Sequence, residues 1–578
     1  MWNFIEQEEM RGILLFYLLE CFYLNLGLAQ QTGKWGDQGN GTFRNPIIAA
    51  DYSDPDPIRV GDDYYMAAST FEDSPGVHIL HSKDLVNWTQ IGGVFQDLIK
   101  VDSAFSWNRM KRYNEGVYAP SLRFHAGKFW IFVNFYTDGF WMATADNPKG
   151  PWEIHIIKDK YGKELRTSGW TDPCPFWDED GKAYLASSHP GAKWYGYLFE
   201  MSPDGRYLLD ADFEHMKIRN IVYQYPNGGT LISPYHSSEG NKIYKRNGYY
   251  YLIHIEFLET GQGQGTYICR SKHIYGTKSD GSPGKPGDPG RYEIRRIDQH
   301  NSEYIQSLPG QGGLVDTPNG DWFWIAQFNK YGSDGRTPCL LPVTWIEDWP
   351  VIGGEPKDGF GKMVWECSKP IPSQQISLPQ GSDEFNTGNL NARWAWNHQP
   401  HENKWSLSER PGYLRLYALK NNTNGKDCFF SIPNVIHQRH MRSDSSIVTV
   451  KMDISRMVIG QKAGLANFNG GISYSLLEIE VDEQGRRRMV YSGNGKKISG
   501  NYLPGKQQYL YMRSSAGFDD IQTYKYSLDG KNFISIGECY LLRMGNYRGN
   551  MIGVFTYNNI EEKGYIDIDW FNYQVKNK

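Results

Sequence analysis

The chain has 578 residues, of which 22% are charged, and its formal net charge is −4. One hydrophobic core rarely serves a chain of this length, so we expect two globular domains. The nearly balanced charge argues against nucleic acid or an anionic membrane surface as a partner, because both require a basic surface. Aromatic residues make up 15% of the chain, which is typical of strand-rich folds and also suits sugar binding, because ring faces stack on the apolar C–H faces of sugars.

The first segment, residues 1–29, is predicted to be a secretory signal peptide, because an apolar run follows one basic residue and ends in small residues. Acidic residues precede the run, which favours translation from Met10. A membrane span is not expected, since Glu20 interrupts the run, which falls short of the ~20 apolar residues that a span needs. Lipidation at Cys21 is the alternative. The protein is therefore predicted to be secreted, to the periplasm or cell surface of a bacterium.

A hairpin pattern recurs five times in the following part of the chain. Each copy has an apolar strand, a turn with glycine and a run of aromatic and aliphatic residues: RVGDDYYMAAS, FHAGKFWIFVN, DEDGKAYLASS, KRNGYYYLIHI and TPNGDWFWIAQ. Such turns favour the positive φ angles of tight β-hairpins. The glycines lie far enough apart for one four-stranded blade each: Gly61, Gly127, Gly181, Gly248 and Gly320. We therefore predict a five-bladed β-propeller over residues 30–355, with the Gly/Pro-rich span 276–290 as a loop of the fourth blade.

Carboxylates stand before the turn glycine in three of the five hairpins. Asp54 precedes its glycine by seven residues, while Asp172 and Glu239 precede theirs by nine. These offsets share parity, so the three side chains should face the same way along their strands if no bulge intervenes. In a propeller the first strand of each blade lines the central channel, so the three acids should converge at one mouth. Tyr118 and Gln311 occupy the corresponding places in the other two hairpins.

The character of the chain changes after a Pro/Gly-rich stretch that follows Trp349. From about Ser377 the sequence shows alternating strands such as GYLRLYAL, SIVTVKMDI, YSLLEIEV and GYIDIDWFNY. No helical periodicity of useful length is present, so residues 377–578 are predicted to form a β-sandwich.

Inward acids in a propeller channel suit glycoside hydrolysis. That reaction needs one acid to protonate the leaving oxygen and a second carboxylate to activate water or to attack directly. A third acid nearby would raise the pKa of its neighbour and keep the general acid protonated. Each acid alone is a weak signal, because Asp-Pro is common in turns and Glu before Gly is common in loops. Three acids at similar positions of a repeat are a much stronger one.

The chain also resembles a known family. The segments NPIIAADYSDPDPIRVGDDYYMAASTF, SPGVHILHSKDLVNW, GVYAPSLRFHAGKFWIF, TDPCPFWDEDGKAYL, SSEGNKIYKRNGYYYL and QGGLVDTPNGDWFW resemble glycoside hydrolase family 43, in order, over residues 45–355. The segments SDEFN, WAWNHQP and KWSLSERPGYLRL resemble the concanavalin-like β-sandwich of the β-xylosidase and α-L-arabinofuranosidase members.

The resemblance implies catalytic roles by position. Asp54, in Tyr-Ser-Asp-Pro, would be the general base, and Asp172, in Trp-Thr-Asp-Pro, would tune the pKa of the acid and orient it. Glu239, in Ser-Ser-Glu-Gly, would be the general acid, and the family inverts the anomeric configuration. Asp56 competes with Asp54, since it lies two residues along the same strand, but Asp54 is the residue that matches the family motif.

Further residues are candidates for binding the sugar. Arg336, in Asp-Gly-Arg-Thr-Pro, matches a family arginine that reaches the sugar, where its fork of donors can fix hydroxyl groups. Phe71, Tyr118 and Trp170 are candidate walls of the sugar subsite, or core residues, and Gln311 is a candidate hydrogen-bonding group. Some relatives carry a His near this Gln that helps to hold a cation. This chain has Gly310-Gln311 there, so we predict no metal at this place. The sequence does not indicate structural Ca²⁺, and no cofactor is required. The cysteines that follow the signal show no C-x-x-C pair, which favours buried thiols: Cys174, Cys269, Cys339, Cys367, Cys428 and Cys539.

The leading hypothesis is an inverting exo-acting hydrolase that releases terminal α-L-arabinofuranose or β-D-xylose from arabinoxylan, arabinan or xyloglucan side chains. The YSDPDPIRVGDDYY and SSEGNK variants of the motifs favour arabinofuranose. The alternatives are a non-catalytic glycan-binding propeller, which would have lost at least one acid, and an endo-arabinanase, which the appended sandwich disfavours. The sandwich itself either completes the active site or is a separate carbohydrate-binding module.

Overall fold

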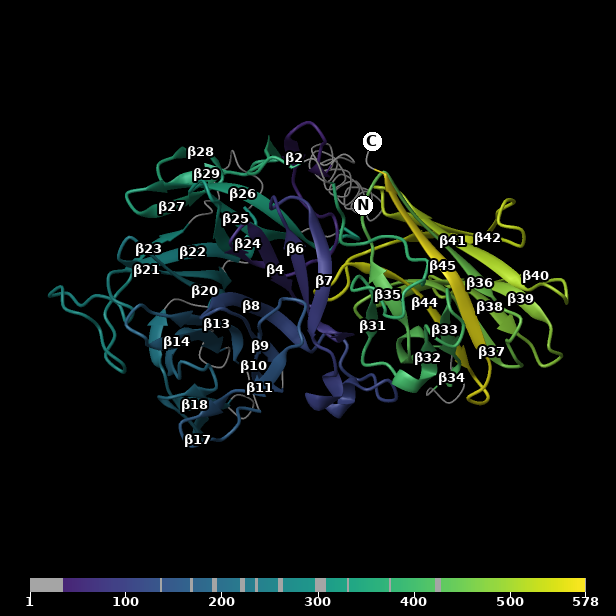
Figure 1. The fold of residues 1–578 in the computed structure, drawn as a ribbon, viewed down its shortest axis with the longest axis horizontal. Helices are drawn as coiled ribbons and strands as arrows, with labels where there is room; N and C mark the ends of the chain where they lie inside the picture. The colour runs from purple at the N-terminus through teal and green to yellow at the C-terminus, as the bar shows by residue number, and fades with distance from the viewer. Residues whose placement is uncertain are drawn as a thin grey trace, which may run out of the picture.

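The computed structural model describes residues 35–135, 138–166, 170–189, 195–218, 224–233, 238–257, 264–296, 308–329, 332–373, 376–421 and 428–576. The predicted signal peptide lies outside them. Within these ranges the regular structure is β-strand apart from short 3-10 helices, which confirms the predicted all-β class (Figure 1). The 3-10 helices are η1 (Leu98–Lys100), η2 (Ser103–Phe105), η4 (Glu402–Lys404) and η5 (Phe429–Ser431). None of the helices in the described ranges has the length and apolar character that crossing a bilayer requires.

Five sheets follow one another along the chain. The first contains β3 (Asp56–Val60), β4 (Asp63–Ala68), β6 (Gly76–Ser82) and β7 (Trp88–Phe95). The second contains β8 (Val117–His125), β9 (Lys128–Phe135), β10 (Gly139–Ala145) and β11 (Glu153–Ile156). The third contains β13 (Thr171–Trp177), β14 (Ala183–His189), β15 (Tyr195–Met201), β16 (Tyr207–Leu208) and β12 (Lys158–Asp159), with β19 (Thr230–Ser233) paired to β15. The fourth contains β20 (Ser238–Arg246), β21 (Tyr249–Phe257), β22 (Gln264–Ser271) and β23 (Glu293–Arg296), and the fifth contains β24 (Gly310–Asp316), β25 (Trp322–Asn329), β26 (Arg336–Ile346) and β27 (Trp349–Ile352).

Each predicted hairpin joins the first two strands of one of these sheets, so the hairpin prediction is confirmed. The five turn glycines have φ angles of 62° to 86°. A Cβ atom at any of them would meet nothing within 4 Å. Glycine is therefore required there by the backbone conformation and not by crowding. The span 276–290 runs between β22 and β23 of the fourth sheet, as predicted.

The first strands of the five sheets are neighbours in space. Contacts join β3 to β8, β8 to β13, β13 to β20 and β20 to β24, and β24 in turn contacts β3. Side chains of these strands therefore meet in the middle of the N-terminal part of the molecule. Smaller sheets lie outside this arrangement: β1 (Gly36–Asp37) with β2 (Thr42–Arg44) and β30 (Glu366–Ser368), β17 (Ala211–Ile218) with β18 (Gln224–Gly228), and β28 (Gly354–Lys357) with β29 (Phe360–Lys362).

The C-terminal part consists of two large sheets, which we call the near sheet and the far sheet (Figure 1). The near sheet contains β40 (Lys496–Tyr502), β39 (Arg487–Gly493), β38 (Ser473–Val481), β37 (Gln461–Asn469), β44 (Asn550–Asn558), β35 (Ile436–Arg439), β31 (Ala395–Asn397) and β5 (Asp73–Ser74), with β34 (Leu419–Lys420) paired to β44. The far sheet contains β32 (Trp405–Ser406), β33 (Leu414–Tyr417), β45 (Tyr565–Lys576), β36 (Ser445–Asp453), β41 (Tyr509–Ala516), β42 (Ile521–Ser527) and β43 (Ile534–Leu541). Apolar side chains of both sheets form one core cluster.

The two parts of the chain share a core. Strand β5 comes from the N-terminal part but pairs with β31 of the near sheet. The cluster that fills the C-terminal part also includes Tyr52, Tyr64 and Trp88, all fully buried. The sandwich therefore packs against the first of the five sheets over a continuous apolar interface.

Candidate active site

An irregularity recurs where the first strand of each sheet begins. One residue near this point in each of the five chain segments has a positive φ: Asp54 (55°), Ala119 (35°), Asp172 (52°), Gly240 (64°) and Gln311 (54°). In four of the five sheets the pairing register also shifts there, as in a β-bulge. A bulge changes the direction of the side chain that it carries, and strained backbone of this kind is concentrated at active sites.

These bulges correct the parity argument made from the sequence. That argument assumed regular strands and matched Asp172 with Glu239. By backbone conformation the residue that matches Asp172 is Gly240, so Glu239 lies one position earlier in its strand. The carboxylates nevertheless converge, because the backbone N–H of Gly240 donates a hydrogen bond to Asp172. The bulges, and not a shared strand parity, place the acids together.

Asp54 is held by partners on several segments. Its backbone N–H donates to the side-chain oxygen of Gln327 at 2.7 Å, and the hydroxyl of Ser69 donates to its Oδ2 at 2.6 Å. The other oxygen, Oδ1, is buried, lies 3.7 Å from a guanidinium nitrogen of Arg336 and makes no hydrogen bond among the described residues. One carboxylate oxygen is thus fixed, while the second is left for a further partner.

Asp172 is buried at the centre of a hydrogen-bond network. Besides the bond from Gly240, it accepts from the hydroxyl of Thr171 at 2.6 Å and from the amide of Gln311 at 3.5 Å. Burial raises the pKa of Asp172, the bonds from Thr171 and Gly240 lower it, and the charge of Asp54 raises it again. The network fixes both oxygens of this carboxylate within the protein.

Glu239 has a raised pKa. Desolvation raises its pKa to about 8, and the negative charges of Asp172 and Asp54 act in the same direction, while Arg336 opposes them. Its side chain is only partly buried. Glu239 is therefore a carboxylic acid that keeps its proton at neutral pH, as a general acid must.

Arg336 contacts both Asp54 and a residue of the sandwich. It begins β26, and its backbone N–H donates to Asp51 at 3.1 Å. Its guanidinium carbon lies 5.2 Å from the ring centroid of Tyr547, which stands in the loop before β44 of the near sheet. The ring of Tyr547 also lies 6.1 Å from that of Tyr118. Tyr547 was not predicted from the sequence, because nothing local marks a loop tyrosine of the second domain as part of the site.

Asp56 has different surroundings from Asp54. Asp56 is fully buried, and its Oδ2 accepts from Arg123 at 2.7 Å and lies 3.7 Å from the ammonium of Lys242. Lys242 donates in turn to Ser121 at 3.1 Å. Asp56 therefore belongs to a buried ion network between the first strands and has no surface for a substrate. The preference for Asp54 rests on this geometry as well as on the motif.

The candidate wall residues differ in their surroundings. Phe71 and Tyr118 form an edge-to-face pair with ring centroids 5.1 Å apart, next to Tyr547. Trp170 is 1% exposed and packs against Phe199 at 5.0 Å in the core of the third sheet. Tyr118 is partly exposed beside Tyr547, while Phe71, which is 0% exposed, and Trp170 both have the burial of core residues.

Gln311 occupies the place where some relatives carry a cation-binding His. Its amide donates to Asp172, and its oxygen accepts from Gln327 at 3.3 Å. Within the described residues no group of three or more His, Cys, Asp or Glu side chains is placed to hold a metal.

Comparisons with known proteins identify the family of this chain. Residues 43–350 match the family model described as glycosyl hydrolases family 43, and residues 382–574 match the beta-xylosidase C-terminal concanavalin A-like domain. A beta-xylosidase of Formosa agariphila is 34% identical over 94% of this chain and 92% of its own length. A non-reducing end alpha-L-arabinofuranosidase of Bacteroides ovatus is 28% identical over 97% of this chain and 98% of its own. Among solved structures, a bifunctional GH43-CE protein of Bacteroides eggerthii has a TM-score of 0.74 at 28% identity; the match covers 94% of this chain and 64% of that longer one.

Proposed function

Since this chain belongs to glycosyl hydrolases family 43 and is a glycosidase, we propose that it is an inverting, exo-acting enzyme that releases a terminal pentose from plant cell-wall polysaccharide. The observation that carries the proposal is the convergence of Asp54, Asp172 and Glu239, from three different sheets, beside Arg336. A non-catalytic binding protein would not need a carboxyl group whose pKa is raised to about 8.

In the proposed reaction Glu239 donates its proton to the glycosidic oxygen as the bond from that oxygen to the anomeric carbon breaks. Asp54 takes a proton from a water molecule, whose oxygen bonds to the anomeric carbon from the opposite face of the sugar. The free Oδ1 of Asp54 suits this role. Asp172 keeps the pKa of Glu239 high through its charge and positions the adjoining backbone through the bond from Gly240. The product sugar has the inverted configuration.

For the fold we propose a five-bladed β-propeller, one blade per sheet. The support is the order of contacts among the five first strands, which returns from β24 to β3. We also propose the division into residues 30–355 and 377–578, which the family matches over residues 43–350 and 382–574 support. Strand β5 is the exception, because it belongs by sequence to the first domain and by pairing to the second. Export of the protein stays a prediction from residues 1–29.

The released sugar is proposed to be β-D-xylose or α-L-arabinofuranose. The relatives at 34% and 32% identity are named beta-xylosidases, which favours xylose over the preference drawn from the motif variants. The test is hydrolysis of p-nitrophenyl β-D-xyloside and α-L-arabinofuranoside, with the anomer of the first-formed sugar followed by NMR. Release of the inverted anomer from either substrate supports the proposal. No release from either, or retention of configuration, contradicts it.

We expect Asp172→Asn to shift the pH dependence of kcat/KM. Glu239 acts while protonated, so wild-type activity falls as pH rises through its pKa of about 8. Removing the charge of Asp172 removes one cause of that raised pKa, so the alkaline limb should move to lower pH by about one unit. The measurement is a pH profile of kcat/KM from pH 4 to pH 10. An alkaline limb that stays in place would contradict the proposed role of Asp172.

Tyr547→Ala should weaken the binding of small substrates although the change lies in the second domain. The guanidinium of Arg336 lies over the ring, which also lies beside Tyr118, so loss of the ring removes one of the contacts that orient Arg336. We expect KM for the aryl pentoside to rise about 5- to 30-fold. Tyr547→Phe keeps the ring and should stay close to wild type. Equal kinetics for Tyr547→Ala and wild type would show that the sandwich does not complete the site.

A further inference from the structure

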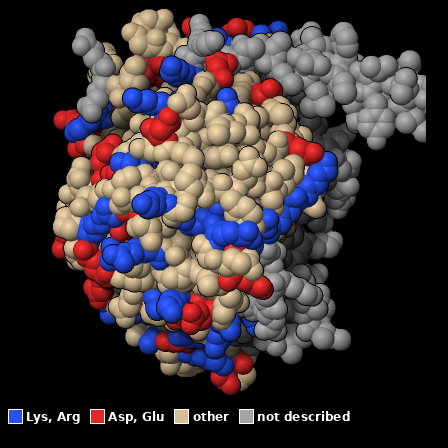
Figure 2. Space-filling model, turned by 90° about the vertical axis from the view of Figure 1, so that its right-hand side faces the viewer, with Lys and Arg blue, Asp and Glu red and all other residues tan. Residues whose placement is uncertain are grey.

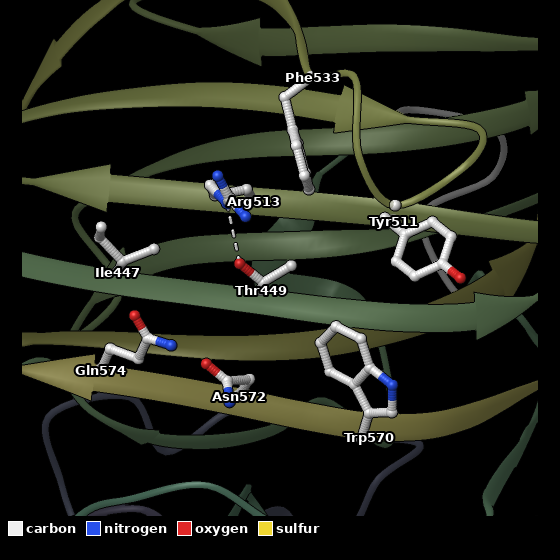
Figure 3. Close-up of a pocket in the computed structure, with 9 residues that line it drawn as sticks. Ile447, Thr449, Tyr511, Arg513, Phe533, Trp570, Asn572 and Gln574 are labelled. Atoms are coloured by element: carbon white, nitrogen blue, oxygen red, sulfur yellow. Dashed lines mark hydrogen bonds between the residues drawn. The ribbon is translucent and has the colours of Figure 1, made fainter.

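A second concave site lies on the far sheet, on the face that turns away from the near sheet. Side chains of β45, β36 and β41 alternate here: Val450 and Met512 point into the sandwich core, while Thr449, Tyr511 and Trp570 point outward. The outward residues border a cavity of about 300 Å³ (Figure 3). None of them belongs to the catalytic site described above.

Aromatic rings form one end of this cavity. Trp570 and Tyr511 stand with ring centroids 6.0 Å apart at an angle of 52°, and Phe533 overhangs the sheet from the loop after β42 (Figure 3). All three are partly exposed, so they do not serve the core of the sandwich. The parts of these rings that the protein leaves uncovered offer flat apolar surfaces on which sugar rings stack.

Polar, mostly neutral groups line the rest of the cavity. Thr449 and Asn572 are cross-strand partners on β36 and β45, and Arg513 lies opposite Thr449 on β41. The Nε of Arg513 donates to the hydroxyl of Thr449 at 2.9 Å, and its guanidinium carbon lies 3.7 Å from the ring centroid of Phe533. The guanidinium is thereby fixed in place, with further N–H donors available in its planar fork. Among the residues that the structure describes, no carboxylate lines the cavity.

The wall of the cavity is built rigidly. Asp529 accepts hydrogen bonds from the backbone N–H groups of Lys531 and Asn532, each at 2.8 Å, and Ser527 accepts from that of Gly530 at 3.0 Å. A Cβ atom on Gly530 would lie 2.9 Å from the ring of Tyr511, so glycine lets the loop pack directly on that ring. The site is therefore formed before any ligand arrives, which lowers the entropy cost of binding.

We propose that this cavity binds a neutral pentose-based polysaccharide chain at a site separate from the catalytic one. Stacking rings, amide and hydroxyl groups and a fixed guanidinium suit a polymer rich in hydroxyl groups and free of charge. On the face of the molecule that Figure 2 shows, Lys and Arg side chains lie beside Asp and Glu side chains. The identity of the polymer rests on the proposed function. An exo-acting enzyme needs chain ends, which are dilute in a polysaccharide, and a second binding site raises the local concentration of these ends at the catalytic carboxylates.

The test is native gel electrophoresis of the full chain in gels that contain soluble arabinoxylan or arabinan. The Glu239→Gln protein is used so that the polymer is not consumed. We expect at least one of the polymers to retard it, and Trp570→Ala or Asn572→Ala, added singly, to weaken the apparent affinity by at least about five-fold. Tyr502→Ala removes an exposed ring from the near sheet and should leave the retardation unchanged. In the otherwise wild-type protein, Trp570→Ala should leave kcat/KM on aryl pentosides within two-fold.

The proposal is overturned if no polymer retards the protein, or if both variants are retarded like their parent. If thermal unfolding shows that Trp570→Ala does not fold, Asn572→Ala decides alone, because its partly exposed side chain lies outside the core. Failure of the proposed function has a different signature. The wild-type protein would then hydrolyse neither aryl pentoside, while retardation by polymer would still depend on Trp570 and Asn572.

Discussion

Replacement of Glu239 by Gln should lower kcat on unactivated oligosaccharides by roughly 10²- to 10⁴-fold, the usual contribution of a general acid. Gln has the same shape but carries no acidic proton, so the leaving oxygen departs as an alkoxide. The size of the loss should depend on the leaving group. A dinitrophenyl pentoside, whose phenolate leaves without protonation, should keep most of its activity, and the measurement is the ratio of kcat on the two substrates.

Asp54→Asn provides the matched contrast. A base that activates water is needed whatever the leaving group, so this variant should lose activity equally on the activated and the unactivated substrate. Glu179→Gln, at an exposed turn of the third sheet, is the control and should behave as wild type. If Glu239→Gln and Asp54→Asn show the same dependence on the leaving group, the roles assigned to the two carboxylates are wrong.

Replacement of Arg548 by Met should cost about 3–5 kcal/mol of stability, because it leaves two buried carboxylates without their partner. Arg548 comes from the sandwich and is 1% exposed. It donates to Glu72 at 2.9 Å and to Asp73 through both terminal nitrogens, one at 3.1 Å. His437 lies 3.2 Å from Asp73 on the other side. The measurement is denaturant unfolding of the full chain, with Arg543→Met, an exposed arginine of the preceding loop, as the control.

The loss of folding stability caused by Arg548→Met should become larger as pH rises. Burial raises the pKa of Glu72 to about 7, with Asp73 acting in the same direction and Arg548 opposing both. Without Arg548 the pKa of Glu72 rises further, so the folded state binds a proton that the unfolded state releases. Stability then falls as pH rises above the unfolded pKa. A deficit below about 0.5 kcal/mol, or one that shrinks between pH 6 and pH 9, would contradict this account of the interface.

Much of this molecule follows from local sequence. The five hairpins were predictable because glycine at each turn adopts a backbone conformation that other residues reach only with strain, and strand formers flank it. The alternating segments after Ser377 indicated a second strand-rich part for a similarly local reason. The three acids could be singled out because they stand at similar places in a repeat. Each hairpin and each alternating strand is contained within a short run of residues, and the acids require only a comparison between the copies of the repeat.

Only the tertiary structure decided how these pieces meet. Because of the bulges, the residue whose backbone position corresponds to that of Asp172 is Gly240 and not Glu239. The sequence could not predict this, because the register of a strand depends on its pairing with the partner strand. Asp56 forms ion pairs with Arg123 and Lys242, which come from other sheets, and so is not available to a substrate. Arg548 and Tyr547 reach the first domain from the second. Such contacts join residues up to several hundred positions apart, and no local pattern records them, because they arise only when the two cores pack together.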